Sequence, residues 1–477
     1  MGCLLSCVWQ RLLFGWLGAL VFQGAAVFAG TVTNANDSGA GSLRQAISDA
    51  ALQPGADTIT FALGLSGQTI TLTGPAGGSA IVINDPAELI IDATSLPGGL
   101  TIRGGGVTGS FRLFSVTGSS VTLNGLTLSG GGGSNFTGEG GAISNQSVLV
   151  LTQCTLTGNS ADNSALGGGA ICHQGFFLQL TRCTLSGNHS NLGTGGGAIS
   201  ATLPFGTLAL DQCTLSGNHA LNSTDGGGAI LSACSVQISQ CTIAGNHADG
   251  SASGGGAILN GGDLQMNYTI AAGNTADNVI LTGPGTLSGA YNLTGGNPLL
   301  APLGDYGGPT QTMALLPGSP ARNATVGSFV ISDQRGFPLV GGPDIGAYEA
   351  GTFSNFNAWI YESLPAPASL AQHGSAADYD GDGVSNLDEW LVLTDPGSAA
   401  NYLRVTQTTI SGNTLNVTFP TVAGRHYSLE ATTNLASAAS WTPVANSVLT
   451  GTGTPATVPI SPITGLTRYF VRVRVGP

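Results

Sequence analysis

Large apolar side chains recur at every second position in short stretches of about the first 300 residues. Leu208 to Leu210 and Cys213 to Leu215 are two such stretches. A period of two places alternate side chains on opposite faces of a strand, whereas a helix needs a period of about 3.6 residues. Glycines and Gly-Asn pairs separate the stretches and are typical of tight turns. The pattern therefore predicts short β-strands joined by tight turns.

Two sequence strings repeat in phase through the middle of the chain. The first, Gly-Gly-Ala-Ile, ends at isoleucines that are spaced by 28, 28, 31 and 28 residues. The second has the form Cys-Thr-Leu/Ile-x-Gly-Asn, and a decayed last copy has Thr269 in place of the cysteine. The repeated positions are Ile143, Ile171, Ile199, Ile230 and Ile258, then Cys154, Cys183, Cys213 and Cys241, then Asn159, Asn188, Asn218, Asn246 and Asn274.

A repeat of this length holds only two or three short strands and cannot bury its apolar side alone. Stacking the copies as coils of a parallel solenoid solves this, with equivalent residues about 4.8 Å apart. We therefore expect an all-β fold, a right-handed parallel β-helix over residues 30–300 with roughly nine coils; the hand follows from the usual crossover rule.

The stack predicts a column for each repeated side chain. The four repeat cysteines alternate in phase with leucines, so we expect them to point inward as free thiols. Disulfides between them are disfavoured because stacked Cβ atoms about 4.8 Å apart are too distant. Cys172 and Cys234 lie off this column and can pair only if the fold brings them together. The asparagines should hydrogen-bond along the stack.

His189, His219 and His247 each follow one of these asparagines and should stack too. We weigh a strip of metal ligands against a ladder of turn or surface histidines, and favour the ladder.

The repeats resemble those of polymorphic outer-membrane proteins, which are right-handed β-helices with paired Gly-Gly-Ala-Ile and Phe-x-x-Asn strings. Here the cysteine-to-asparagine string replaces the phenylalanine string. The segment from Thr31 to Asn84 is similar to the entry segment of such proteins. We expect a helix at Ser38–Ile47 that caps the open end of the solenoid, then strands at Thr58–Phe61 and Thr69–Leu72.

Residues 301–350 contain four further strings, Asp305 to Thr312, Pro317 to Ala321, Asp333-Gln334-Arg335-Gly336 and Asp344 to Glu349. Closely and in order, they resemble the choice-of-anchor Q domain, whose members are exported bacterial β-helix proteins with varied surface anchors. The family's usual isoleucine and aspartate are replaced by Arg322-Asn323. We interpret the acids and Arg335 as a buried polar network that closes the last coil, in preference to a catalytic set.

Residues 378–389, inside a predicted linker at 351–400, fit the twelve-residue calcium loop at every required position. Calcium prefers such an all-oxygen set, whereas zinc selects histidine or thiolate. The alternative is an acidic, solvated turn. The loop also resembles the calcium-bound linkers of thrombospondin type 3 repeats and dockerin-like motifs, which implies a structural Ca²⁺. The expected ligands are Asp378, Asp380, Asp382, the Val384 carbonyl, Asn386 and Glu389.

Alternating stretches return in residues 401–477, at Leu415–Phe419, Tyr427–Glu430 and Tyr469–Val475. Between turn residues they predict a small β-sandwich. The sequence leaves open whether this module binds a glycan or the cell wall, or directs sorting.

Residues 1–29 have the pattern of a secretory signal peptide, with Arg11 before a short apolar run and small residues at the cleavage point. The mature protein is then exported, secreted or attached to the cell surface, without an integral membrane span. With 25 acidic and 12 basic residues the net charge is −13, which disfavours a nucleic-acid partner.

Two functions remain in competition. The first is a non-catalytic adhesive or structural protein of the cell surface, a monomer that binds a polysaccharide or surface glycan. The second is a polysaccharide lyase or glycoside hydrolase, since β-helices include both. Glycosidases need paired carboxylates, and the acids of the coils fall mostly in loops or turns; Arg182 is the only arginine of the repeats proper. The acids are Glu139, Asp162, Asp211, Asp225, Asp249 and Asp263. We favour the first function.

Overall fold

A computed structural model describes most of the chain, and Ala29 is its first described residue. The predicted signal peptide, apart from Ala29, lies outside this part. The chain forms two compact units that divide between Gly296 and Asn297. The described residues are 29–105, 111–133, 138–193, 195–223, 226–249, 255–275, 277–281, 285–325, 331–365, 368–433, 441–462 and 469–476.

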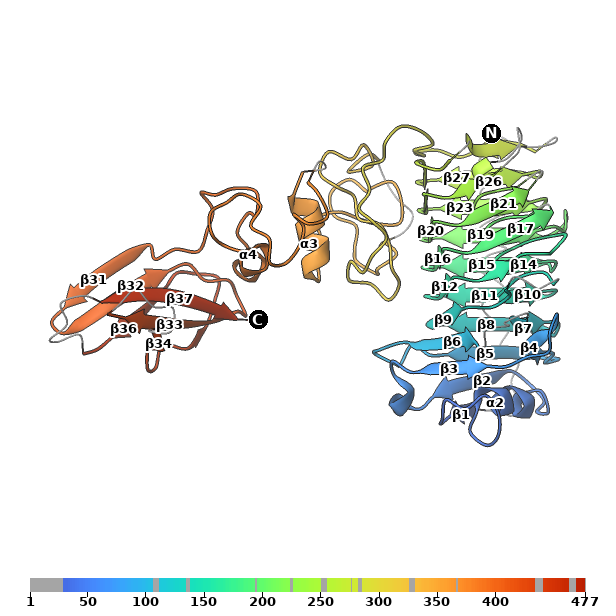
Figure 1. Cartoon of the computed structure of the whole chain (residues 1–477), viewed down its shortest axis with the longest axis horizontal. Helices are drawn as coiled ribbons and strands as arrows, with labels where there is room; N and C mark the ends of the chain where they lie inside the picture. The colour runs from blue at the N-terminus through green and yellow to red at the C-terminus, as the bar shows by residue number, and fades with distance from the viewer. Residues whose placement is uncertain are drawn as a thin grey trace, which may run out of the picture. The chain divides into compact units, whose positions relative to one another are not determined.

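The first unit is a parallel β-solenoid of about eight turns, one fewer than expected (Figure 1). A full coil passes through three long parallel sheets and, in the middle repeats, a shorter fourth one. The first sheet, within the described residues, contains β1 (Ala29–Val32), β2 (Asp57–Phe61), β5 (Glu88–Asp92), β8 (Ser120–Asn124), β11 (Val148–Thr152), β15 (Phe177–Thr181), β19 (Thr207–Asp211), β23 (Ser235–Ser239), β27 (Leu264–Asn267) and β30 (Leu287–Ser288).

The other sheets of this unit follow the same order along the stack. The second contains β4 (Ser79–Ile83), β7 (Arg112–Val116), β10 (Ile143–Asn145), β14 (Ile171–His173), β18 (Ile199–Ala201), β22 (Ile230–Ser232), β26 (Gly255–Asn260) and β29 (Asp277–Leu281). The third contains β3 (Thr69–Leu72), β6 (Leu100–Gly104), β9 (Leu126–Ser129), β12 (Thr155–Thr157), β16 (Thr184–Ser186), β20 (Thr214–Ser216), β24 (Thr242–Ala244) and β28 (Ile270–Ala271). The fourth contains β13 (Ser160–Ala161), β17 (His189–Gly193), β21 (His219–Ser223) and β25 (His247–Ala248).

The repeat cysteines form the predicted inward column. Cys154, Cys183, Cys213 and Cys241 are fully buried in the solenoid core. Each thiol sulfur accepts the main-chain N–H of the preceding copy, as in Cys183 N to Cys213 Sγ at 3.4 Å. Thr269 continues the column, because its hydroxyl oxygen accepts from Cys241 N at 3.3 Å. These thiols and those of Cys172 and Cys234 are free, and burial raises the pKa of Cys183 well above its usual value.

Each of the central coils has residues in the left-handed region at two recurring positions. One precedes the column cysteine or its threonine, with φ of 53° at Gln153, Arg182 and Gln212. The other is the glycine before the column asparagine, with φ of 60° at Gly187 and 65° at Gly217. Glycine has no steric penalty there, which explains the Gly-Asn string.

The asparagine column joins the coils by side-chain hydrogen bonds. Asn218 Nδ2 donates to Asn246 Oδ1 and to the main-chain oxygen of Leu185, both at 2.9 Å. Its own Oδ1 accepts from the N–H and the Nδ2 of Asn188, at 3.1 and 3.0 Å. Asn159 makes the equivalent bonds two coils away, so each asparagine satisfies buried main-chain groups at the turn.

The helix that caps the first coil is α2 (Leu43–Ala50), and the short 3-10 helix η1 spans Leu63–Leu65. The prediction of a helix at 38–47 was wrong at its start. Gly39 and Gly41 have positive φ, and the Ser42 hydroxyl caps the helix by accepting from Gln45 N. The apolar side of α2 packs into the solenoid core.

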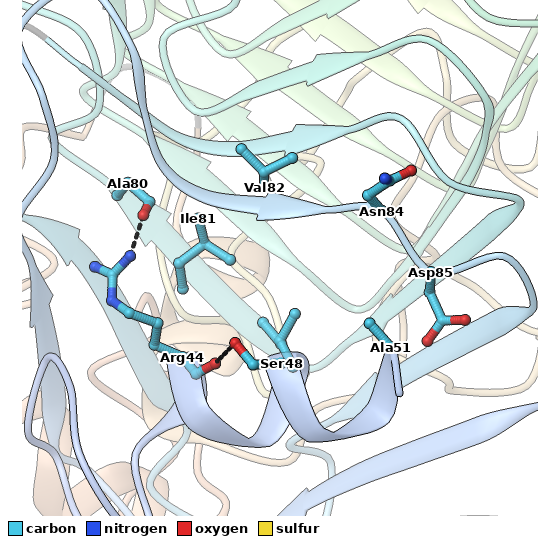
Figure 2. A pocket seen from close by; sticks show the side chains of 9 residues that line it. Arg44, Ser48, Ala51, Ala80, Ile81, Val82, Asn84 and Asp85 are labelled. Carbon is cyan, nitrogen blue, oxygen red and sulfur yellow. Dashed lines mark hydrogen bonds between the residues drawn. The ribbon is translucent and has the colours of Figure 1, made fainter. Parts of the chain in front are cut away.

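Arg44 fixes this cap to the ends of two sheets. Its guanidinium bonds the main-chain oxygen of Ala80 on β4, as Figure 2 shows, and the oxygen of Thr73 at 3.0 Å. It also pairs with Asp37 at 2.6 Å. Beside it, a groove between α2 and β4 is lined by Ser48, Asn84 and Asp85 among others. Main-chain oxygens of the end strands, which would otherwise invite edge pairing, are thereby occupied.

The second unit begins with irregular turns and ends in two small antiparallel sheets. Its helices are α3 (Phe356–Ser363) and α4 (Asn386–Val392). The described strands form one sheet of β31 (Gln407–Ser411), β32 (Thr414–Phe419) and β36 (Ala456–Ile460), and another of β33 (His426–Thr432), β34 (Thr442–Pro443), β35 (Leu449–Thr450) and β37 (Phe470–Gly476).

Side chains from both small sheets, including Phe419 of β32 and Leu429 of β33, share one core, which agrees with the expected sandwich. Nowhere in the described part of the chain is a helix both long and apolar enough to cross a bilayer.

Replacing Asn218 by alanine should destabilise the solenoid by about 3 kcal/mol. The change leaves the N–H of Asn188 without its acceptor and removes a donor from the Leu185 oxygen, and each buried unpaired group costs about 1–3 kcal/mol. Urea unfolding followed by circular dichroism measures the effect. The control is Gln265→Ala, whose side chain is exposed on β27. Equal stability of the two variants would contradict a structural role for the column.

Candidate functional site

The acidic loop at residues 378–389 is held by hydrogen bonds between its own carboxylates and main chain. Asp378 accepts from Gly381 N and Gly383 N at 2.8 and 2.9 Å. Asp382 Oδ1 accepts from Val384 N at 2.8 Å. The loop then enters α4, whose N-cap is Ser385. These bonds turn the first three acidic side chains toward one another, with one oxygen of each lying within 4.8 Å of the others.

Four buried oxygens of this loop have no hydrogen-bond partner. They are Asp380 Oδ2, Asp382 Oδ2, Asn386 Oδ1 and Glu389 Oε2. Leaving a buried acceptor unsatisfied costs free energy, and several in one loop require an explanation. All four belong to the residues that the sequence singled out as ligands, and oxygen is the donor that hard cations prefer.

The two candidate ligands that belong to α4, Asn386 and Glu389, are both buried. Asn386 is fully buried, and its Nδ2 donates to the main-chain oxygens of Gln372 and Gly374 at 2.8 and 3.0 Å. Its oxygen is thereby free to face the loop. Glu389 is also fully buried, and burial, together with the charges of Asp380 and Asp382, raises its pKa to about 7. The site as described has an excess of negative charge that a bound cation would neutralise.

Aromatic side chains connect this loop to α3. Trp359 of α3 and Trp390 of α4 lie 5.5 Å apart between ring centroids. Tyr361 stacks on His373, with 4.2 Å between the ring centroids. His373 follows Gln372, whose main-chain oxygen accepts from Asn386. A change in the order of the loop should therefore affect the packing of α3 against α4. The fluorescence of Trp390, which directly follows Glu389, can report that change.

The acids of the segment 301–350 form a buried polar network with Arg335, as the sequence interpretation predicted. Arg335 is fully buried and pairs with Asp333 at 2.7 Å. It also donates to the main-chain oxygens of Thr352 and Glu349, at 3.0 and 2.6 Å, and lies 3.7 Å from the centre of the Tyr348 ring. All three guanidinium nitrogens of Arg335 donate to protein oxygens, which indicates a structural role.

Further carboxylates complete this network. Glu349 accepts from the N–H groups of Val340 and Asp344, both at 2.9 Å, and burial raises its pKa to about 7. Glu362 of α3 binds the Tyr348 hydroxyl and Arg322, so the network extends into the linker segment.

The acids of the coils are placed singly, apart from one group. Asp263 binds the Thr286 hydroxyl at 2.8 Å, and burial raises the pKa of Asp211. Glu139 lies near the Cys172 thiol, with 3.9 Å between oxygen and sulfur. Asp225 lies outside the described residues. Arg182 donates to Gln212 at 3.0 Å.

The exception is the group that Asp249 forms with His219 and His247 at the fourth sheet, while Asp162 lies beside His189 in a separate pair. Sequence reasoning treated the histidines and these acids separately. The spacing of His247, which begins β25, and Asp249, which directly follows that strand, was the available signal.

A search of known protein families and a search of curated proteins both return no match for this chain.

Proposed function

We propose that this protein is an exported bacterial cell-surface β-helix of the choice-of-anchor Q type, with repeats like those of polymorphic outer-membrane proteins. In this proposal the solenoid is a rigid, non-catalytic scaffold that binds surface carbohydrate. The parallel solenoid supports the scaffold, and the strings in residues 301–350 support the family assignment. The signal-like residues 1–29 support export.

The binding role is supported by one observation. Exposed aromatic side chains lie at equivalent turns of two successive coils. Phe176 and Phe205 are 77% and 90% exposed, and both precede strands of the first sheet. Phe176 lies next to the following coil, since its main-chain oxygen accepts from Thr207 N at 3.0 Å. Leu203 in the same turn is partly exposed. Exposed apolar groups gathered in one place mark interaction sites, and flat rings suit the apolar faces of sugars.

The first sheet around this turn is rich in hydroxyl and amide groups, and the charge of Asp211, at the end of β19, is partly offset by Arg182. The outward positions of β15, β19 and β23 include Gln179, Thr181, Thr207 and Gln237. Such groups donate and accept hydrogen bonds without a charge requirement. They favour a neutral polysaccharide over a polyuronate, which the net charge of −13 would repel.

The acidic loop is the proposed calcium site, with a structural Ca²⁺ held by Asp378, Asp380, Asp382, the Val384 carbonyl, Asn386 and Glu389. The four unpaired oxygens described above support this assignment. When bound, the cation would balance the crowded carboxylates. Asn386 connects the loop to the segment before it through a hydrogen bond to Gln372, and the contact between Trp359 and Trp390 connects α4 to α3. The expected effect is a stiffened segment between the irregular turns and the terminal sandwich.

Removing calcium should lower the stability of this segment. At a free Ca²⁺ concentration 100 times the dissociation constant, binding stabilises the folded state by about 2.7 kcal/mol. Addition of a chelator should therefore change tryptophan fluorescence and speed protease cleavage within residues 351–400.

The variants for this test differ in one carboxylate of the same loop. Asp380→Ala should remove the response to calcium, since one of its oxygens is among the unpaired ones. Asp388→Asn is the control, because Asp388 binds Ser385 and lies outside the ligand set. A wild type that ignores calcium, or a loss in the control equal to that in Asp380→Ala, would refute the assignment.

Alanine at both Phe176 and Phe205 should weaken glycan binding by roughly two- to tenfold per ring, from an aromatic contribution of about 0.5–1.5 kcal/mol each. The measurement is retention on a panel of neutral polysaccharides and polyuronates, with product analysis on the same samples. Leu63→Ala, which removes an equally exposed apolar group elsewhere on the solenoid, should leave binding unchanged. Reducing or unsaturated products would favour the competing function, a polysaccharide lyase or hydrolase, and overturn the non-catalytic role.

A further inference from the structure

Three histidines stand in one column on the fourth sheet. His189, His219 and His247 are the first residues of β17, β21 and β25, and they pair in parallel register. Each directly follows a buried column asparagine, and the N–H of His219 donates to the oxygen of Asn188 at 2.9 Å. The rigid stack therefore fixes the main chain of these histidines, while about a third of each side chain stays exposed.

Asp249 joins two of the imidazoles into one group. His219 Nε2 lies 3.3 Å from Asp249 Oδ2, and His247 Nε2 contacts Asp249 Oδ1. The centres of the two rings are 4.4 Å apart. One ligand atom of each residue lies within 4.8 Å of the other two. Two imidazole nitrogens and a carboxylate oxygen thus converge from two coils.

Hydrogen bonding leaves part of this group unexplained. The Nε2 atom of His219 is almost sealed from solvent and has no hydrogen-bond partner, although Asp249 is near. The 3.3 Å between His219 Nε2 and Asp249 Oδ2 instead fits two ligands of one metal ion. With bonds of about 2.0–2.2 Å, two ligands of a tetrahedral zinc ion lie roughly 3.3 Å apart.

We propose that His219, His247 and Asp249 bind a borderline divalent cation such as Zn²⁺. The two Nε2 atoms and the carboxylate supply three ligands, and the partly exposed position of the side chains leaves the fourth to water. Imidazole donors select this class of ion over calcium, so the site is chemically distinct from the loop at residues 378–389.

His189 offers a matched comparison within the same column. Its Nε2 lies 3.0 Å from Asp162 Oδ1, in a separate pair one coil away. It shares strand position, side-chain type and exposure with His219, yet it is outside the three-ligand group. In a histidine ladder without a metal site, substitutions at His189 and His219 should have the same effect on zinc binding. The proposal predicts that only the substitution at His219 weakens it.

The experiment measures Zn²⁺ binding to the mature chain by calorimetry, at neutral pH with excess Ca²⁺ so that the acidic loop does not take up zinc. We expect one equivalent of bound Zn²⁺. His219→Gln, His247→Gln and Asp249→Asn should each weaken binding by at least roughly tenfold, because even outer-shell substitutions cost 10–100-fold. His189→Gln should bind as the wild type does.

Cobalt provides a second measurement that does not depend on stability. Co²⁺ added to the wild type should give the visible absorption of a low-symmetry nitrogen and oxygen site, and Asp249→Asn should lose it while its circular dichroism stays native. Asp249 directly follows the two-residue strand β25, so this near-isosteric change should leave the fold intact. Absence of zinc binding in the wild type would overturn the proposal. So would binding that survives in Asp249→Asn, or that depends equally on His189.

Discussion

Main-chain contact between successive coils is the constraint on which the rest of this structure depends. Parallel strands of neighbouring coils pair in register, so each residue lies over its equivalent in the next copy. At the start of the second sheet the approach is closer still: a Cβ added at Gly197 would lie 2.1 Å from the Gly228 oxygen. Only glycine fits there, which explains why the Gly-Gly-Ala-Ile string recurs.

Register turns the repeated side chains into columns with separate roles. The cysteine column fills the core, and a threonine replaces a cysteine at its end because the hydroxyl accepts the same N–H. The asparagine column satisfies main-chain groups at the turn. The stack also holds the aromatic turn at Phe176 and Phe205 and the group around Asp249 on a rigid scaffold.

Much of the solenoid could be predicted because its signals are local and repeated. The strands at Thr58–Phe61 and Thr69–Leu72, the inward cysteines and the asparagine column all follow from period and phase. The left-handed residues before each cysteine could not be predicted, since Gln153 and Arg182 carry no glycine-like signal. The approach of Asp249 to His219 depends on contact between coils, which spacing along the chain does not reveal. The acidic loop was found from its motif, whereas its unpaired oxygens required coordinates.

The stacking of coils is tested most directly by distances between spin labels on outward positions of the first sheet. The described cysteines are buried, so cysteines introduced in their presence can be labelled selectively. Asn267 is separated from Thr152, Asn124 and Asp92 by four, five and six register steps. At about 4.8 Å per step, the three label pairs should be about 19, 24 and 29 Å apart. Distances that fail to increase evenly in this order would contradict the columns on which the account depends.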